Sequence, residues 1–402
     1  MRIYLSCLQS PVRHPIPAYA FWERYFKRGI EEAGSRWIET PDIDWAEGLV
    51  YTSGLTRTAH PALDAWRERT WSVVFDHIRR EHARRPIDCF LGYLYPQQVD
   101  PSAIAAIRDL GIPCVNFFCD NVRQFTAIPG EYGAFDLHWV PEHKAMRLYR
   151  LAGFEAINLP MPAWVAPADR SCTPVERYGA TFIGSHDVQR EALFARVIDL
   201  GGPVTLRGPG WDGGGPDVPA RAPLAGGSMR SVVRHQVEFA RSQGAIALAR
   251  RIGTRISERF SQPPSRQAFD GHVQETVFGQ AYVDVTQQSR VTLGVNRYPS
   301  YRAPASRPDT YSRLRDIEAP MLGACYLTEW TEGLDQLYEL GTEIETYRDA
   351  EEMVEKIARL ERDAPRRAAM RCRAQKRALS EHGVPSSLSA LGCRLGVPRA
   401  AP

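Results

Sequence analysis

Residues 315–345 place the strongest constraint on the fold of this chain. The segment reads RDIEAPMLGACYLTEWTEGLDQLYELGTEIE, in which a helix begins at Arg315 and breaks at Gly323 before the apolar run ACYL. The pattern then predicts a second helix and a second strand. Strands that alternate with helices normally lie parallel in one sheet and carry the helices on its faces. The segment therefore predicts an α/β protein.

The same alternation recurs along most of the chain. Strands are expected at residues 2–5, 89–93, 114–119, 136–140, 180–183, 204–207 and 290–295, and helices at residues 19–33, 61–81, 101–110, 143–151, 188–200 and 365–379. A Pro-rich stretch at residues 160–174 predicts a linker between the two series. Residues 211–228 are rich in Gly and Pro and predict a loop, whereas residues 230–280 follow neither period.

The composition indicates a protein of two domains. A chain of 402 residues accommodates two domains of roughly 150 residues each. The net charge of +3 argues against general nucleic-acid binding. The first residues lack the basic and apolar regions of a signal peptide, and no apolar run is long enough to span a membrane. The eight cysteines show no CxxC spacing, so we expect reduced thiols in a cytoplasmic protein.

A resemblance to a known family begins around Glu318. The run Arg315-Asp316-Ile317-Glu318, followed by Gly323, is similar to the R-x-F-E hallmark of the CgeB-like (spore-maturation) glycosyltransferases. Weaker likenesses occur upstream in the order of that family, in PCVNFFCDN, FDLHWVPEHKAMRLYRLAGF, ATFIGS and LRGPGW. Together they extend over most of the chain apart from residues 212–280.

The resemblance implies a GT-B fold, in which two Rossmann-like domains face each other across a cleft. We expect an acceptor domain at residues 1–165 and a nucleotide-sugar-binding domain at residues 175–365. Residues 366–402 would form a basic helix and tail that cross back onto the first domain. Ligands of open parallel sheets lie beyond the carboxyl ends of the strands, so the candidate residues are sought there.

Glu318 is the main candidate for binding a nucleotide. By resemblance, its carboxylate accepts hydrogen bonds from the ribose hydroxyls, and a carboxylate can accept two at once. The alternative is a helix N-terminal Glu that the helix dipole alone favours. Arg315 either contacts a phosphate or pairs with a local acid, Asp316 or Glu318. Gly323 is assigned to the same site because glycine lets backbones approach closely.

Five further residues at or beside strand ends are candidates for the donor site. Gly184 and Ser185 follow an expected strand and open a helix that carries Arg190, and the N–H groups of a helix N-terminus favour a diphosphate. A tight turn is the alternative explanation for Gly184. Arg207 and Gly208 end the next strand.

Asn296 and Arg297 follow the expected strand RVTLGV, where the family has a comparable Asn. They either reach the sugar or the phosphates or belong to a turn directed by Pro299. In the first domain, Asp120 follows the buried run PCVNFFC and is a candidate to orient or deprotonate an acceptor hydroxyl, with a turn cap as the alternative. His14, in the loop SPVRHPIP, is a candidate acceptor or sugar contact, with plain surface as the alternative.

Two departures from related enzymes bear on mechanism. Retaining GT-B enzymes often carry a second Glu eight residues before the ribose-binding one, and Thr310 stands there in this chain. Asp42-Ile43-Asp44 is a formal D-x-D, but its position after a proline near the N-terminus indicates a chance turn. We therefore expect no metal ligand, and a diphosphate would be neutralised by arginines and helix dipoles.

The basic helix at residues 365–379 has two interpretations. A basic amphipathic helix can lie on an anionic membrane surface. We favour a solvated face that balances acids elsewhere, such as those of residues 349–361. A lipid-linked acceptor stays open under either interpretation.

Taken together, these residues predict a glycosyltransferase that transfers a sugar from a nucleotide-diphosphate sugar to an acceptor hydroxyl, without a metal or a tightly bound cofactor. A GT-B-like protein that binds a nucleotide or glycan without catalysis is the alternative. The sequence leaves open the sugar, the base, the stereochemical outcome and the oligomeric state. A glycan, a lipid-linked molecule, a small molecule and a protein all stay open as the acceptor.

Overall fold

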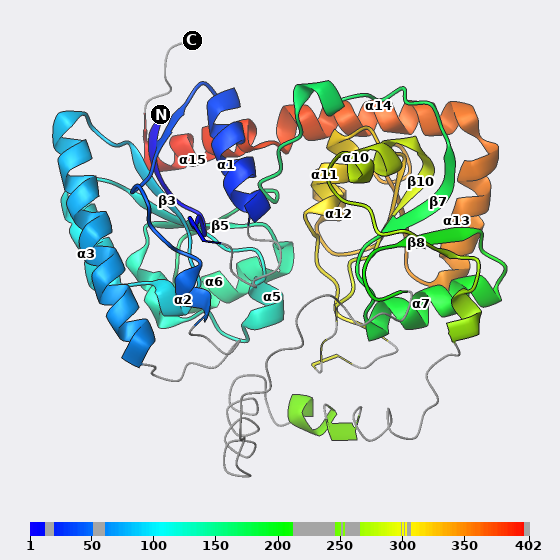
Figure 1. The fold of residues 1–402 in the computed structure, drawn as a ribbon, viewed down its shortest axis with the longest axis horizontal. Coiled ribbons are helices and arrows are strands. Elements are labelled where there is room, and N and C mark those ends of the chain that lie inside the picture. The colour runs from blue at the N-terminus through cyan, green and yellow to red at the C-terminus, as the bar shows by residue number, and fades with distance from the viewer. Residues whose placement is uncertain are drawn as a thin grey trace. The chain divides into compact units, whose positions relative to one another are not determined.

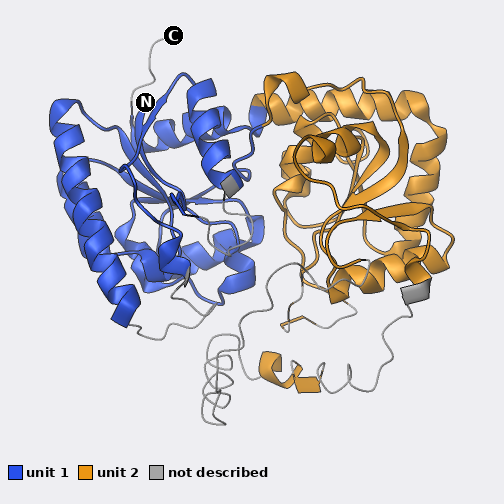
Figure 2. Cartoon of the chain, viewed as in Figure 1, with its two compact units in different colours: residues 1–164, 381–402 blue, residues 165–380 orange. Residues whose placement is uncertain are grey.

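The computed structural model describes residues 1–12, 20–50, 61–211, 246–250, 252–253, 266–298, 300, 302–303 and 307–397. The chain divides into two compact units, which Figure 2 distinguishes by colour. Unit 1 consists of residues 1–164 and 381–402, and unit 2 of residues 165–380. Each unit contains one parallel sheet.

The sheet of unit 1 has the strand order β2-β1-β3-β4-β5-β6 (Figure 1). Its strands are β1 (Arg2–Ser6), β2 (Arg36–Ile38), β3 (Cys89–Tyr93), β4 (Cys114–Phe117), β5 (Leu137–Val140) and β6 (Ala156–Asn158). The helices are α1 (Ala20–Glu32), α2 (Glu47–Val50), α3 (Pro61–Arg84), α4 (Pro101–Asp109), α5 (Asn121–Gln124), α6 (Met146–Ala152) and α15 (Val384–Leu395), with 3₁₀ turns at Pro96–Gln98, Gly130–Ala134 and His143–Ala145. Every residue of β3, β4 and β5 is buried, as expected for central strands covered on both faces.

The sheet of unit 2 has the order β12-β11-β10-β7-β8-β9. Its strands are β7 (Tyr178–Ile183), β8 (Val204–Arg207), β9 (Val273–Gln274), β10 (Ser289–Gly294), β11 (Tyr326–Glu329) and β12 (Glu345–Tyr347). The helices are α7 (Val188–Asp199), α10 (Gly279–Gln288), α11 (Arg315–Met321), α12 (Leu334–Leu337), α13 (Ala350–Arg362) and α14 (Ala364–Glu381), with 3₁₀ turns at Pro167–Asp169 and Arg266–Phe269. The two sheets confirm the predicted α/β fold.

The C-terminal residues return to unit 1, as predicted for the fold. There α15 packs on α1 so closely that a Cβ added to Gly29 would lie 2.3 Å from the Cβ of Val384. Ala163 and Gly383 form a β-bridge beside this contact. The return begins at Glu381, because the preceding turns of α14 lie in unit 2.

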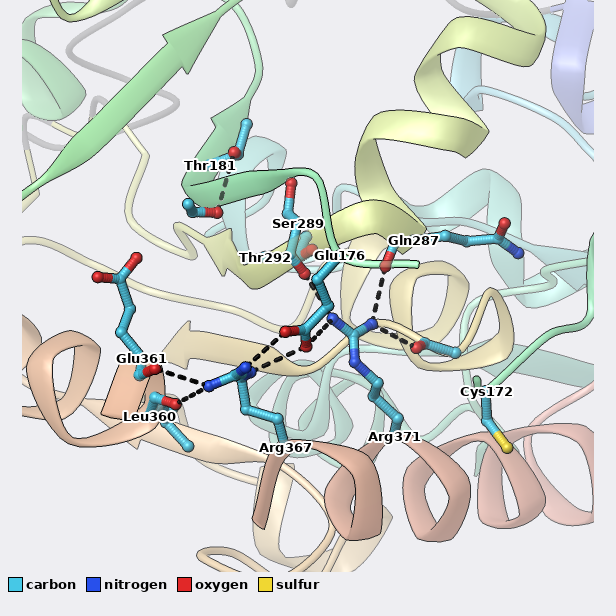
Figure 3. Close-up of polar contacts among 12 residues, drawn as sticks. Cys172, Glu176, Thr181, Gln287, Ser289, Thr292, Leu360, Glu361, Arg367 and Arg371 are labelled. Carbon is cyan, nitrogen blue, oxygen red and sulfur yellow. Dashed lines mark hydrogen bonds and ion pairs between the residues drawn. The ribbon is translucent and has the colours of Figure 1, made fainter. Parts of the chain in front are cut away.

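The basic helix α14 is not a solvated face along its whole length. Arg367 and Arg371 are only 3% and 2% exposed, and Figure 3 shows both guanidinium groups pointing at Glu176. Arg367 Nε donates to Glu176 Oε1 over 2.9 Å, and Arg371 donates to the carbonyl oxygens of Gln287, Ser289 and Gly323 over 2.6–2.9 Å. The solvated-face interpretation is therefore wrong for these two arginines, which tie α14 to the segments around β7, β10 and β11.

The expectation of reduced thiols is also wrong for one pair of cysteines. Cys172 and Cys372 form a disulfide whose Cα atoms lie 5.0 Å apart, between the segment before β7 and α14. Nothing in the sequence brings these residues together, since 200 positions separate them. The other six cysteines are free, and Cys393 alone among them is exposed.

Two elements of unit 2 differ from the sequence prediction for a physical reason. The strand expected at residues 324–327 is β11, which starts two residues later and runs to Glu329. The helix α10 begins at the end of residues 230–280, the region without a recognisable period, and its remaining residues carried no prediction. Its buried residues are Val285, Thr286 and Gln287, of which two are polar, so they give no hydrophobic signal at helical spacing. The predicted loop at residues 211–228 lies outside the described residues beyond Trp211.

Candidate functional site

The order of strands in unit 2 changes direction between β7 and β10. From β7 the chain continues through β8 to β9 on one side, and from β10 through β11 to β12 on the other. Neighbouring strands that are followed in opposite directions define a topological switch point, where open α/β sheets bind their ligands. The loops at its carboxyl edge begin with Gly184 after β7 and with Val295 and Asn296 after β10. The predicted donor residues thus fall at this edge.

Gly184 and Gly208 bring the ends of β7 and β8 together. The N–H of Gly184 donates to the carbonyl of Arg207 over 2.7 Å, and a Cβ on Gly208 would lie 2.3 Å from the oxygen of Gly184. Gly208 also has φ 141°, which favours glycine. The oxygen of Gly184 accepts a hydrogen bond from Trp211 Nε1 over 2.8 Å. Close backbone packing therefore accounts for both glycines.

The N-terminus of α7 is capped by its own chain. Asp187 Oδ1 accepts hydrogen bonds from the backbone N–H groups of Gln189 and Arg190, both over 2.9 Å. Arg190 Nη1 donates to the carbonyl and hydroxyl oxygens of Ser185 over 2.7 and 3.1 Å. Two amides of this helix N-terminus are therefore already occupied, and contact of Gly184, Ser185 and Arg190 with a diphosphate stays a prediction.

Three arginines gather at the carboxyl edge of β7. The pKa of Arg190 is lowered to about 10, mainly by burial and then by the positive charges of Arg313 and Arg315, against the opposing charge of Asp187. Arg313 lies over the ring of Tyr311 at 4.9 Å, and its Nε is buried without a hydrogen-bond partner among the described residues. Grouped cations in a protein interior are unfavourable unless an anion neutralises them. The cluster formed by Arg190, Arg313 and Arg315 is therefore suited to an anion.

Arg315 and Glu318 both start from α11 and both touch Tyr282. Arg315 Nη1 donates to the carbonyl oxygen of Ile183 at the end of β7, and its guanidinium lies 5.4 Å from the centre of the Tyr282 ring. Glu318 Oε2 accepts a hydrogen bond from the hydroxyl of Tyr282 over 2.5 Å. The remaining acid of the motif, Asp316, has a structural role.

Asp316 lies on the buried side of α11 and is fully buried. Its oxygen Oδ1 accepts hydrogen bonds from the hydroxyls of Tyr326 and Thr328 over 2.9 and 3.0 Å, and Oδ2 accepts one from the N–H of Arg313 over 3.0 Å. Burial raises the pKa of this carboxyl. Asp316 therefore fixes α11 on β11 and leaves Glu318 as the acid of this motif that is half-exposed.

Asn296 and Arg297 are held by a residue that sequence reasoning missed. Arg297 Nε and Nη2 donate to Oε1 of Glu329 over 2.9 and 2.6 Å. The backbone N–H groups of Asn296 and Arg297 donate to Oε2 of the same carboxylate over 3.1 and 2.9 Å. Glu329 thus joins the end of β10 to the end of β11. The sequence signal that could have identified Glu329 is an acidic residue at the last position of a strand. It was missed because the strand was expected to end at Leu327, two residues before Glu329.

Arg207 and Gly323 lie away from the arginine cluster. Arg207 Nη1 donates to the carbonyl of Glu275 over 3.3 Å, and its guanidinium lies over the ring of Tyr178 at 5.5 Å. Gly323 has φ 78°, and a Cβ there would lie 2.1 Å from the carbonyl oxygen of Ser171. Packing against the backbone therefore accounts for Gly323, and its contact with a ligand stays a prediction.

In unit 1, Asp120 lies beside a buried polar network at the ends of β4 and β5. The carboxylate Glu142, 1% exposed, accepts a hydrogen bond from Asn121 Nδ2 over 2.6 Å, and Asn121 Oδ1 accepts one from the hydroxyl of Tyr149 over 2.8 Å. Burial raises the pKa of Glu142 to about 8, and the nearby charge of Asp120 acts in the same direction. Sequence reasoning missed Glu142, although it follows an expected strand in the run VPEHK.

Two further predictions concern His14 and the D-x-D. His14 lies outside the described residues. Asp44 Oδ1 accepts a hydrogen bond from the N–H of Glu47 over 2.9 Å, which places the D-x-D in the turn that opens α2. Across the described ranges, His, Cys, Asp and Glu form no group of three or more arranged to hold a metal ion. Among the same residues, no helix is long and apolar enough to cross a membrane.

Comparison with known proteins finds one family match over part of the chain and several structures of similar fold. Residues 250–386 match a protein family described as glycosyl transferase-like. Over its whole length the chain is similar to a sucrose-phosphate synthase from Thermosynechococcus elongatus, at 12% identity and a TM-score of 0.53, with 98% of both chains covered. It is similar to a glycosyltransferase from Rickettsia africae at 8% identity and a TM-score of 0.56, covering 100% and 99% of the two chains.

A third structure extends the likeness to a nucleotide complex. The Anabaena protein HepE in complex with UDP is 11% identical, with a TM-score of 0.52 and with 98% of this chain and 99% of that chain covered. No curated protein matches the sequence. The chain therefore has the GT-B fold, with a glycosyl transferase-like sequence over the second half of unit 2 and into the return to unit 1.

Proposed function

We propose that this protein is a glycosyltransferase of the CgeB-like type, which transfers a hexose from a nucleotide-diphosphate sugar to an acceptor hydroxyl. The observation that carries the proposal is the cluster of Arg190, Arg313 and Arg315 at the switch point of unit 2. Glu318 lies on the same helix as Arg315, one turn further along. The three arginines would bind the diphosphate of a nucleotide sugar, and the carboxylate of Glu318 would bind its ribose.

The arginines supply what the transfer reaction requires. When the bond between sugar and diphosphate breaks, negative charge develops on the leaving diphosphate. Preorganised positive groups at that point normally provide the largest single contribution to catalysis. Guanidinium groups also bind phosphate oxygens in a bidentate manner, which fixes the orientation of the leaving group. We therefore propose that Arg190, Arg313 and Arg315 replace the metal ion that other diphosphate-binding enzymes use.

The likeness to known proteins supports the proposal. The family matched by residues 250–386 is glycosyl transferase-like, and the segment includes Arg313, Arg315 and Glu318. The HepE structure, which has the same fold, was determined with UDP. We propose that unit 2 binds a nucleotide sugar in the same manner, and that unit 1 binds the acceptor with Asp120 among its contacts.

The test is a thermal-shift panel with UDP, GDP, TDP, ADP and their sugars, without and with Mg²⁺. A ligand at a hundred times its dissociation constant stabilises the folded protein by about 2.7 kcal/mol. We expect stabilisation by one nucleotide, independent of Mg²⁺ and lost in Glu318→Ala. Release of free nucleotide from the corresponding sugar, measured with candidate acceptors, then separates a transferase from a protein that only binds. No stabilisation by any nucleotide would refute the proposal.

We also propose that the protein acts in the cytoplasm. Five buried free cysteines fit a reducing compartment, whereas the disulfide between Cys172 and Cys372 is more typical of an oxidising one. Fractionation of cells that produce the full-length protein tests the assignment, and we expect the protein in the cytoplasmic fraction. Recovery of the protein in another fraction would contradict the cytoplasmic assignment.

A further inference from the structure

Tyr282 contacts both Arg315 and Glu318 at the predicted donor site. Its hydroxyl donates to Glu318 Oε2 over 2.5 Å, and its ring lies beneath the guanidinium of Arg315 at 5.4 Å. The two contacts use different parts of the same side chain. The hydroxyl donates a hydrogen bond to the carboxylate of Glu318, and the aromatic face contacts the guanidinium of Arg315.

The protonation state of Tyr282 fits this dual contact. Burial raises the pKa of the phenol, and the charge of Glu318 acts in the same direction, while Arg315 opposes them. The hydroxyl therefore keeps its proton at neutral pH and acts as a donor to the carboxylate. A hydrogen bond from a neutral donor to an ionised acceptor is among the stronger hydrogen bonds in proteins.

The neighbouring contacts limit how Arg315 and Glu318 can move. Arg315 also donates to the carbonyl oxygen of Ile183, so its guanidinium is fixed between the end of β7 and the ring of Tyr282. Glu318 is fixed at Oε2, which sets the plane of its carboxylate. Tyr282 comes from α10 and both partners from α11, so the register between these helices determines the distance between cation and carboxylate.

We propose that Tyr282 is a positioning residue that sets the carboxylate of Glu318 for the ribose of the donor and the guanidinium of Arg315 for its diphosphate. The inference rests on the proposed function, because it assigns the two partners to one nucleotide. It names the ligand more narrowly as a ribonucleoside diphosphate. A carboxylate held in one plane distinguishes a ribose from a deoxyribose, since a site built to bind a hydroxyl rejects the analogue that lacks it.

The experiment measures binding to the full-length protein by calorimetry, with UDP, 2′-deoxy-UDP and inorganic pyrophosphate as probes. If the thermal-shift panel selects another base, its ribo- and deoxyribonucleotides replace those of uracil. Tyr282→Phe removes the hydroxyl and keeps the ring. Tyr282→Leu removes both. Tyr132→Phe is the matched control, because it deletes a buried tyrosine hydroxyl that donates to the carbonyl of Leu94 in unit 1.

We expect Tyr282→Phe to weaken the ribonucleotide by about tenfold, which is the effect of one hydrogen bond to a charged group. The deoxynucleotide should change little, so the preference for ribose falls by the same factor. Pyrophosphate should bind Tyr282→Phe as it binds the wild type, and Tyr282→Leu more weakly, because Arg315 then loses its aromatic support. Tyr132→Phe should leave all three affinities unchanged.

A double-mutant cycle with Glu318→Ala gives the decisive result. If Tyr282 acts through Glu318, the hydroxyl no longer matters once the carboxylate is absent, and the combined variant binds no worse than Glu318→Ala alone. Additive losses, or an unchanged ribose preference in Tyr282→Phe, would overturn the inference while nucleotide binding by the wild type still upheld the proposed function. Wild-type protein that binds no nucleotide would refute both.

Discussion

Glu329 holds Arg297 by its side chain and by its backbone at once. One carboxylate oxygen accepts two hydrogen bonds from the guanidinium, and the other accepts the N–H of Arg297 and that of Asn296. The side chains of Arg297 and Glu329 are 11% and 4% exposed. This buried ion pair fixes the loop after β10 beside the predicted donor site, where the sequence suggested that Arg297 itself would reach a ligand.

Removal of one partner from this pair should be strongly destabilising. Glu329→Gln leaves the guanidinium of Arg297 buried without its counter-charge, and breaking a buried ion pair in this way costs about 3–5 kcal/mol. Urea unfolding followed by circular dichroism measures the effect. Glu351→Gln is the control, because it removes an equally short ion pair with Arg196 whose side chains are both 55% exposed. Similar midpoints for the two variants would contradict a buried, coupled pair.

The stability of unit 1 should depend on pH through Glu142. Its pKa is about 8 in the folded protein and 4.5 is the ordinary value, so folding favours the protonated form. The contribution of protonated Glu142 to the free energy of unfolding is fully present below pH ~4.5 and is lost as the pH rises through about 8. The whole change amounts to roughly 4–5 kcal/mol. Relative to Glu142→Gln, which stays neutral, the wild type should therefore lose stability between pH 5 and pH 9.

The difference between melting curves of wild type and Glu142→Gln across that pH range is the measurement. Glu155→Gln provides a comparison, because Glu155 is an exposed acid of the same unit, paired with Arg394. A constant difference between wild type and Glu142→Gln at every pH would show that Glu142 does not change its charge in this window.

Arg313 should matter more for ligand binding than for the ligand-free fold. Arg313→Gln removes one of three neighbouring positive charges, which relieves repulsion on Arg190. The hydrogen bond from Arg313 Nη2 to the carbonyl of Arg297 is lost, so the two effects on stability oppose each other. We expect little change in the ligand-free melting temperature, together with weaker binding of a nucleoside diphosphate by at least tenfold, the loss of one charged hydrogen bond.

Calorimetric titration with pyrophosphate checks this expectation without a choice of base. Arg196→Gln is the matched control, since it removes an exposed arginine on α7 of the same unit. Equal pyrophosphate affinities in Arg313→Gln and wild type would exclude Arg313 from the anion site.

The disulfide should add stability in proportion to the long loop that it closes. Cross-linking residues 200 positions apart restricts the unfolded chain, and the entropic estimate for such a loop is about 5 kcal/mol. Cys172→Ser and reduction of the wild type should therefore lower the melting temperature to the same value. Cys393→Ser, at the exposed free cysteine, is the control. A reductant that leaves wild-type melting unchanged would contradict a formed disulfide.

Local sequence signals predicted the strands and helices well and the contacts between them poorly. The runs CFLGY and VTLR were predicted as strands with the bounds that β3 and β8 have in the structure. Apolar runs and their punctuation by glycine are local properties, so they are readable in one sequence. The position of β7 beside β10 is not, because the chain between them contributes two other strands.

The predicted site was incomplete for the same reason. Arg315 and Glu318 lie within one motif and were found together. Arg313 was missed although it stands two residues before the motif, since only the fold brings it to Arg190. Glu329 and Tyr282 act through partners more than 30 positions away in the sequence. Residues that hold a site in place from other elements carry no local pattern that identifies them.

The buried arginines of α14 also have a consequence for the synthesis of the protein on the ribosome. Arg371 supplies donors to the carbonyls of Gln287 and Ser289 at the start of β10 and to that of Gly323, and α15 covers α1 in unit 1. Both helices follow every described strand of the two sheets along the chain, so they are translated after those strands. The amino-terminal unit therefore cannot be completed when its own strands emerge, and a nascent chain released before α14 and α15 would leave both units open. Folding of the two units is thereby delayed to the same late moment of translation.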